Sequence, residues 1–351
     1  MLDLKTSYMG LSLKNPLVVG SSSLTGHLAG VKKCAASGAG AIVLKSLFEE
    51  QIAAEAGQLG EYAEYSGHGE ATDYLHRYGM ELGPSEYVSL VRQAKQETDV
   101  PIIPSLNCLS EEKWLSYAAK LERAGADALE LNVAWLPTSA KVTAAELEAR
   151  YCKTLQLVKQ QLSIPVAMKI GPYFTSFANL GDLLGRNRTQ PPPFGVGWCG
   201  PASGEQKIVW HAADSLVLFN RFYQFDIDID QLELTAGNPY STSDELHTPL
   251  RWVSLLAGRL DSDLAVTSGV HNGADVIKAL LAGATVTQLC STLFQNGLEQ
   301  VGRILEELTS WMERHGFKSL EDFRGRLSQE KSASPEQFER LQYIKLFVGV
   351  E

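Results

Sequence analysis

The sequence predicts an α/β fold, namely a (β/α)8 TIM barrel with an N-terminal hairpin and a C-terminal helical extension. Three observations support this. Apolar runs are continuous rather than alternating, which is typical of parallel strands buried on both faces. These runs alternate with amphipathic segments to give about eight βα units. Small-residue turns such as Ala124-Gly125-Ala126 and Ala282-Gly283-Ala284 lead into several of the strands.

The expected elements follow in chain order. A short hairpin is predicted at residues 4–13, a first strand at 17–22, a helix at 28–37 and a second strand at 41–46. The remaining strands are expected at 100–107, 128–133, 164–170, 215–220, 263–269 and 285–291. An open doubly wound sheet is the alternative architecture. It favours a GxGxxG turn after the first strand, and GSSSLTG matches that pattern poorly.

Two insertions interrupt the alternation. Residues 48–84 are rich in Gly, Glu, Tyr and His, and we expect such a loop to cover a site at the top of the barrel. Residues 184–211 hold three consecutive prolines and five glycines where the barrel helix between strands five and six belongs. A long helix is expected at 295–315 and a short one at 319–327. The predicted division is a barrel domain at 1–327 and a helical tail at 328–351.

Composition limits the functional classes. The 351-residue chain is 44% hydrophobic and 21% charged, as in soluble globular proteins. Its net charge of −10 argues against a nucleic-acid partner. Five scattered cysteines show no metal-ligand spacing, so we expect reduced thiols, a cytoplasmic location and no bound metal. No signal peptide or membrane span is expected, the partner is a small-molecule substrate, and a homodimer is left open.

The segment 264–293, LAVTSGVHNGADVIKALLAGATVTQLCSTL, organises the predicted site. It reads as a strand, a turn, a helix and a second strand, and both strands end on Gly, Ser or Thr. Backbone N–H groups and hydroxyls converge at such turns, and the loops after strands seven and eight of a barrel commonly bind phosphate. We therefore predict a phosphate site here.

Polar residues end the other predicted strands. Lys45 and Lys169 are costly to bury unless they face an anion or a polar ligand. Asn107, Asn132 and Asn220 add amides at the same edge. A phosphate site, two lysines and several amides indicate a phosphorylated aromatic cofactor, and flavin mononucleotide (FMN) fits that shape. A Schiff-base aldolase is a competing use of Lys169.

These motifs resemble the dihydroorotate dehydrogenase family, particularly its soluble class-1 branch, over roughly residues 4–327 apart from the insertion near 184–211. The resemblance rests on the stretches NPLVVGSS, AGAIVLKS, ELNVAWLP, VAMKIGPYF, VLFNRF and SGVHNGADVIKALLAGATVTQLCSTLF. It implies an FMN-binding barrel. The implied cofactor-binding residues are Gly20, Ser21, Ser22, Lys45, Ser46, Asn132, Lys169, Ser268, Gly269, Ser291 and Thr292. The implied catalytic residues are Lys169, Asn132 and Lys45, and the implied substrate-binding residues are Lys45, Asn132 and Asn220.

The sequence also departs from the family. Trp135 stands where the family has a Cys or Ser base, and an indole cannot take a proton. Thr138, Ser139 or His68 is a candidate replacement. Ser268 and Cys290 stand where the family has glycines, and the family's substrate-binding loop is not recognisable.

The expected activity is therefore an FMN-dependent oxidoreductase acting on the CH–CH group of a dihydropyrimidine-like substrate, as in the oxidation of dihydroorotate to orotate in pyrimidine biosynthesis. Because of Trp135, we expect weak turnover of dihydroorotate itself. A non-catalytic or differently specific flavin-binding barrel is one alternative. A dihydrouridine synthase-like enzyme is another, although it needs a basic RNA surface that a chain of net charge −10 does not suggest.

Overall fold

A computed structural model of the chain describes residues 2–55, 83–135, 138–189, 210–221 and 225–339. Its centre is a sheet of ten parallel strands in the order β5-β7-β8-β9-β10-β13-β14-β3-β4-β6. The strands are β3 (Leu17–Val19), β4 (Ala41–Val43), β5 (Leu47–Phe48), β6 (Ile102–Ile103), β7 (Ser105–Asn107), β8 (Leu129–Asn132), β9 (Val166–Ile170), β10 (Ser215–Leu218), β13 (Asp263–Thr267) and β14 (Val286–Leu289).

The ten strands fill the eight positions of a barrel because two positions are interrupted. β4 pairs with β6 and β5 pairs with β7, so β4 and β5 form one position and β6 and β7 form the next. Pro104, which has no N–H to give to a ladder, separates β6 from β7. β14 pairs with β3, and this closes the ring between the last position and the first. The predicted (β/α)8 barrel is confirmed.

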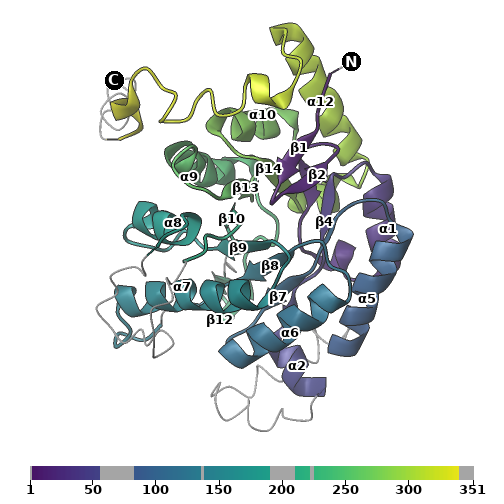
Figure 1. Cartoon of the computed structure of the whole chain (residues 1–351), viewed down its shortest axis with the longest axis vertical. Helices are drawn as coiled ribbons and strands as arrows, with labels where there is room; N and C mark the ends of the chain where they lie inside the picture. The colour runs from purple at the N-terminus through teal and green to yellow at the C-terminus, as the bar shows by residue number, and fades with distance from the viewer. Residues whose placement is uncertain (1, 56–82, 136–137, 190–209, 222–224, 340–351) are drawn as a thin grey trace.

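Helices cover the outside of the sheet (Figure 1). Those that follow the eight strand positions are α1 (Leu28–Ala36), α5 (Pro84–Glu97), α6 (Glu111–Arg123), α7 (Ala144–Gln161), α8 (Phe177–Gly185), α9 (His247–Leu256), α10 (Gly273–Ala282) and α12 (Gln300–His315). Their apolar faces pack on the strands to form the larger core. Local signals agree with the packing. At the start of α7, for example, Thr143 and Glu146 form a reciprocal capping box.

The predicted N-terminal hairpin closes the bottom of the barrel. Its strands are β1 (Thr6–Tyr8) and β2 (Leu11–Leu13). Tyr8 and Met9 belong to a second apolar cluster with inward-facing residues of the barrel strands, several of which are alanines. The Met9 amide also donates to the Asp263 carboxylate at 2.6 Å. The bottom is thereby filled, and the open end is the one where the strands terminate.

The C-terminal part differs from the expectation. The helix predicted at 295–315 begins later, because α12 spans its residues 300–315. Residues 295 and 296 belong to a separate helix, α11 (Ser291–Asn296), which ends before Gly297. Gly297 has a φ of 79°, a left-handed conformation that ends a helix. The short helix predicted at 319–327 is wrong, since only a 3-10 turn, η3 (Leu320–Asp322), forms there. Between 328 and 339 the chain forms the 3-10 turn η4 (Pro335–Phe338), and the rest of the predicted tail lies outside the described residues.

The structure places a helix at the start of the first predicted insertion and another just before the second. The first opens with α2 (Glu49–Glu55), and its next residues, 56–82, lie outside the described part of the chain. The missing barrel helix of the second insertion is present as α8, just upstream of the proline run. Residues 190–209 of that insertion are not described. A backbone bridge between Arg188 and Trp210 joins the two ends of that excursion.

One element was not predicted. After β10 the chain forms an antiparallel hairpin from β11 (Phe225–Asp228) and β12 (Glu233–Ala236). Phe225, Ile227 and Leu234 on it are 62%, 56% and 72% exposed. Alternating apolar and acidic residues give the segment its period of two, which is the pattern of a strand.

In the described ranges, no helix is long and apolar enough to cross a bilayer.

Candidate active site

A cavity of about 170 Å³ lies at the carboxyl ends of strands on one side of the barrel. It is smaller than typical ligand pockets of roughly 300–1,000 Å³, so it has room for only part of a cofactor-sized ligand. It is lined by Gly20, Ser21, Lys169, Phe219, Asn220, Arg221, Pro239, Ser241, Thr267, Ser268, Gly269, Val270, Gln288, Cys290 and Ser291. Seven of the residues predicted for the site are among them.

The two turns predicted to hold phosphate meet at this cavity. Gly269 has a φ of 75°, and a Cβ added there would lie 2.3 Å from the Leu246 backbone nitrogen, so only glycine fits. Ser241 joins the turns. Its hydroxyl accepts from the Gly269 amide at 3.2 Å, and its own amide donates to the Ser291 hydroxyl at 2.9 Å. N–H and O–H donors of both turns are therefore gathered in one place.

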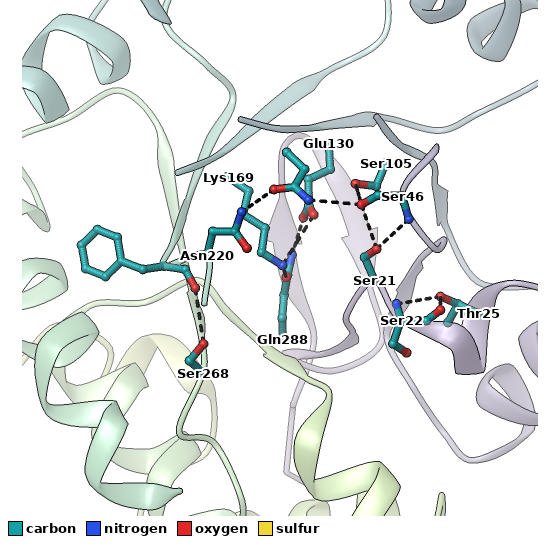
Figure 2. Close-up of polar contacts among 12 residues, drawn as sticks. Ser21, Ser22, Thr25, Ser46, Ser105, Glu130, Lys169, Asn220, Ser268 and Gln288 are labelled. Carbon is teal, nitrogen blue, oxygen red and sulfur yellow. Dashed lines mark hydrogen bonds and ion pairs between the residues drawn. The ribbon is translucent and has the colours of Figure 1, made fainter. Parts of the chain in front are cut away.

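Hydroxyls and amides form a row from the first strand toward the sixth (Figure 2). The Ser46 amide donates to Ser21 Oγ at 2.9 Å, and Ser46 Oγ lies 2.8 Å from Ser105 Oγ. Asn132 Nδ2 donates to Ser46 Oγ at 3.3 Å, and Asn220 Nδ2 donates to Asn132 Oδ1 at 2.6 Å. Each side chain orients the next, and the row reaches the cavity lining at its two ends, Ser21 and Asn220.

Lys169 lies at the centre of the site. Its residue is only 9% exposed, although it carries an ammonium group. Nζ donates to Gln288 Oε1 at 3.2 Å and lies 3.8 Å from Glu130 Oε1. A buried ammonium needs such partners because desolvation is costly. Lys169 therefore lines the cavity, and the buried carboxylate of Glu130 partly compensates its positive charge.

Besides Ser241, three further polar residues described for the site were not predicted. Arg221 lines the cavity, and its guanidinium pairs with Glu245 at 2.9 Å and donates to the Asn238 carbonyl at 2.8 Å. Arg221 directly follows Asn220 in LFNR, so its position at a strand end was visible in the sequence. Gln288 and Glu130 are polar residues inside the apolar strands VTQL and LELN, which was also a readable signal.

Other predicted residues lie outside the cavity lining. The Thr292 hydroxyl donates to the His271 carbonyl at 3.0 Å and so supports the turn from behind. Lys45 is half-buried, and its stem lies beside Gly26. Ser22 is likewise not part of the lining. Ser46 and Asn132 do not line the cavity either, but they are tied to it through the row of hydrogen bonds.

Trp135 is packed into the protein. It is 8% exposed, its ring meets Tyr151 edge-on at 4.8 Å, and the Arg150 guanidinium lies 4.0 Å from its centroid. Burial raises the pKa of the Tyr151 phenol to about 12. Thr138 and Ser139, two candidate replacements for the base, are exposed and do not line the cavity. The third, His68, lies outside the described residues.

Burial also acts on the one thiol of the cavity lining. Cys290 lines the cavity, and its burial raises the pKa of the thiol above its usual range. A raised pKa keeps the group protonated at neutral pH. Only the deprotonated thiolate is a good nucleophile, so the raised pKa lowers the reactivity of this thiol. The raised pKa therefore argues against Cys290 as an activated nucleophile.

Comparison with known proteins agrees with this geometry. The family model described as dihydroorotate dehydrogenase matches residues 3–180, just over half of the chain. The chain belongs to the dihydroorotate dehydrogenase family. This confirms the family resemblance of the sequence motifs, and it supports an oxidoreductase. The match covers the strands that carry Gly20, Ser21, Asn132 and Lys169.

Individual relatives of this family are distant but cover nearly the full length. The catalytic subunit of dihydroorotate dehydrogenase B (NAD(+)) from Thermoplasma acidophilum is 24% identical over 93% of this chain and 99% of its own. The corresponding subunit from Methanocaldococcus jannaschii is 24% identical over 92% and 97%. Dihydroorotate dehydrogenase A (fumarate) from Limosilactobacillus reuteri is 26% identical over 89% and 94%. The relatives thus differ in the electron acceptor that their names state.

Proposed function

We propose that the chain binds FMN at the carboxyl ends of the barrel strands and exchanges a hydride with a dihydropyrimidine-like substrate. The observation that carries this proposal is that Lys169, the Ser268–Gly269 turn and Ser291 line one cavity. These residues come from the fifth, seventh and eighth strand positions, and the barrel closure brings them together. Membership of the dihydroorotate dehydrogenase family supports the same chemistry.

The donors present fit a phosphorylated flavin. The N–H groups of Gly269 and Ser241 hold the two turns together. The Ser291 hydroxyl accepts one of these bonds and keeps its own proton to donate to a phosphate, and the Ser268 hydroxyl lies in the same cavity lining. Arg221, which pairs with Glu245, adds a guanidinium group to the cavity lining. The small volume suits the phosphate end of FMN, and the amide row beyond it suits the polar edge of a flat ring.

The residues then have distinct roles. Bound FMN would supply the two-electron acceptor for a hydride. Lys169 would place a positive charge where the ring becomes negative, which is the general way in which fixed charges stabilise a developing anion. Asn132 and Asn220 would orient the ring and the substrate, since their mutual bond of 2.6 Å fixes both amides.

The proton that leaves a CH–CH substrate needs a general base within hydrogen-bonding reach. Trp135 cannot act as one, and the exposed Thr138 and Ser139 do not line the cavity. We therefore expect dihydroorotate to be oxidised slowly. Mixing FMN-loaded protein with dihydroorotate, with fumarate or NAD(+) as acceptor, tests this, and rapid orotate formation would contradict it.

Cofactor content tests the proposal directly. Purified protein should be yellow, and the chromophore released by denaturation should have the mass of FMN. Apoprotein should quench FMN fluorescence on titration, and Lys169→Met and Ser291→Ala should each weaken binding. Lys33→Met, at an exposed position on α1, is the matched control and should leave the affinity unchanged. Protein that stays colourless when soaked in FMN refutes the proposal.

The buried Trp135 favours a second candidate, a flavin-binding barrel without dihydropyrimidine turnover. Anaerobic mixing of FMN-loaded protein with several dihydropyrimidines, and separately with NADH, separates the two. Bleaching of the flavin absorbance by a dihydropyrimidine supports the oxidoreductase. Stable yellow colour with every donor supports the non-catalytic protein.

A further inference from the structure

A carboxylate lies beneath the candidate flavin site, and the proposed function does not use it. Glu130, on β8, is 1% exposed inside the barrel. Its Oε2 accepts from Gln288 Nε2 at 2.6 Å. Its Oε1 is buried without a hydrogen-bond donor in the described ranges and lies 3.8 Å from Lys169 Nζ. The carboxylate is thus turned toward the lysine that lines the cavity.

Gln288 connects the two charges. It is 2% exposed on β14, and the oxygen and the nitrogen of its side-chain amide form hydrogen bonds with different residues. Oε1 accepts from Lys169 Nζ, and Nε2 donates to Glu130 (Figure 2). The reverse orientation would point an NH2 group at an ammonium, so the neighbouring charges decide how the amide lies. The three residues form one unit, referred to below as the Lys–Gln–Glu relay.

Stability does not account for this unit. Replacing a buried ion pair by apolar residues is often neutral or stabilising, because desolvation offsets the attraction. Apolar residues such as Ala167 and Val217 pack in the same barrel lumen. A buried carboxylate aimed at a cavity-lining ammonium is instead typical of functional sites, where fixed charges are set against each other.

We propose that Glu130 is a positioning residue that acts through Lys169, and this rests on the proposed function. Its carboxylate holds the ammonium in place through Gln288 and reduces the positive potential at the cavity. A compensated lysine stabilises an anionic ring less than an uncompensated one does. Glu130 therefore keeps the reduction potential of bound flavin low, whereas Lys169 raises it.

Glu130→Gln tests the sign of this effect. The substitution keeps the shape and removes the charge. Sulfite binds reversibly to many protein-bound flavins and leaves negative charge on the ring, so its affinity reports local positive charge. Sulfite should bind FMN-loaded Glu130→Gln protein about tenfold more tightly, with a midpoint potential about 30 mV higher, the two-electron equivalent of tenfold. Lys169→Met should shift both quantities in the opposite direction.

Matched variants isolate the relay. Glu49→Gln is the control, because Glu49 is also a buried carboxylate, 2% exposed, but binds the amides of Leu109 and Ser110. It should leave sulfite affinity unchanged. Glu130→Asp keeps the charge and should stay near wild type. In a Lys169→Met background, Glu130→Gln should have little effect, because the residue acts through the lysine.

The outcomes are separable. If wild-type protein takes up no FMN, the proposed function fails and this inference fails with it. If FMN binds but Glu130→Gln leaves sulfite affinity and potential unchanged, only this inference is overturned. An equal shift in Glu49→Gln protein, or a full effect without Lys169, also overturns it. Should Glu130→Gln fail to fold, Glu130→Met removes the same charge with an apolar side chain and should raise sulfite affinity in the same direction.

Discussion

Replacing Trp135 tests whether this residue is part of the protein core or part of the site. The indole is 8% exposed and packs against Tyr151 and Arg150. Truncation of a buried Trp to Ala costs about 3–5 kcal/mol, and this total includes the loss of the contacts that the ring makes. We expect Trp135→Ala to lower the free energy of unfolding by about 4 kcal/mol, since the contacts of the indole with Tyr151 and with Arg150 are both lost.

Trp135→Phe is the matched variant. It keeps an aromatic ring against Tyr151, and it removes an indole N–H that is buried without a hydrogen-bond acceptor in the part of the chain that the structure describes. An unpaired buried N–H costs about 1–3 kcal/mol, so its removal offsets much of the lost contact area. We expect Trp135→Phe to lie within about 1 kcal/mol of wild type.

Urea unfolding followed by far-ultraviolet circular dichroism measures both variants without relying on tryptophan fluorescence. With a slope of about 3–4 kcal/mol per M for a chain of this size, Trp135→Ala should lower the midpoint by about 1 M. FMN affinity of Trp135→Phe should equal that of wild type. A loss below about 1 kcal/mol for Trp135→Ala, or equal losses in the two variants, would refute the packing role.

Three other perturbations follow from the same geometry. Asn132→Ala breaks the bonds to Asn220 and Ser46 and should weaken FMN binding about tenfold in a fluorescence titration, while Asn179→Ala, on the exposed face of α8, should not. Burial raises the pKa of the Cys290 thiol, so its alkylation by iodoacetamide should stay slow at neutral pH and accelerate only above the usual thiol range near about pH 8.5. Bound FMN should protect the thiol from alkylation. Equal alkylation rates with and without FMN would argue against the proposed cofactor position. For Glu122, burial raises the pKa of the carboxyl, but hydrogen bonds from Ser163 and Ile164 outweigh it, so the pKa is lower in the folded protein. The carboxylate therefore stabilises the fold above its unfolded pKa of about 4.3 and loses that contribution as pH falls through the folded value, so the melting-temperature deficit of Glu122→Gln should be present at neutral pH and vanish in acid.

The sequence alone determined the barrel fold and many of the residues at the carboxyl ends of its strands. Continuous apolar runs identify strands that are buried on both faces, and this pattern is local, so it can be read without coordinates. Because parallel strands end at one side of a barrel, the residues that end them are brought together whatever the details of packing. Ser21, Asn220, Ser268 and Ser291 were therefore expected at this edge, and they line one cavity.

Other features depended on the tertiary structure. Glu130 and Gln288 are 158 residues apart in sequence, and only closure of the barrel shows that they share a hydrogen bond across its lumen. Rotamer and packing, which no linear pattern records, direct Thr292 to a carbonyl and Trp135 into the core. Strand-end position thus predicts which residues reach the open end of the barrel. Long-range packing decides which of them face the ligand and which charge partners they meet there.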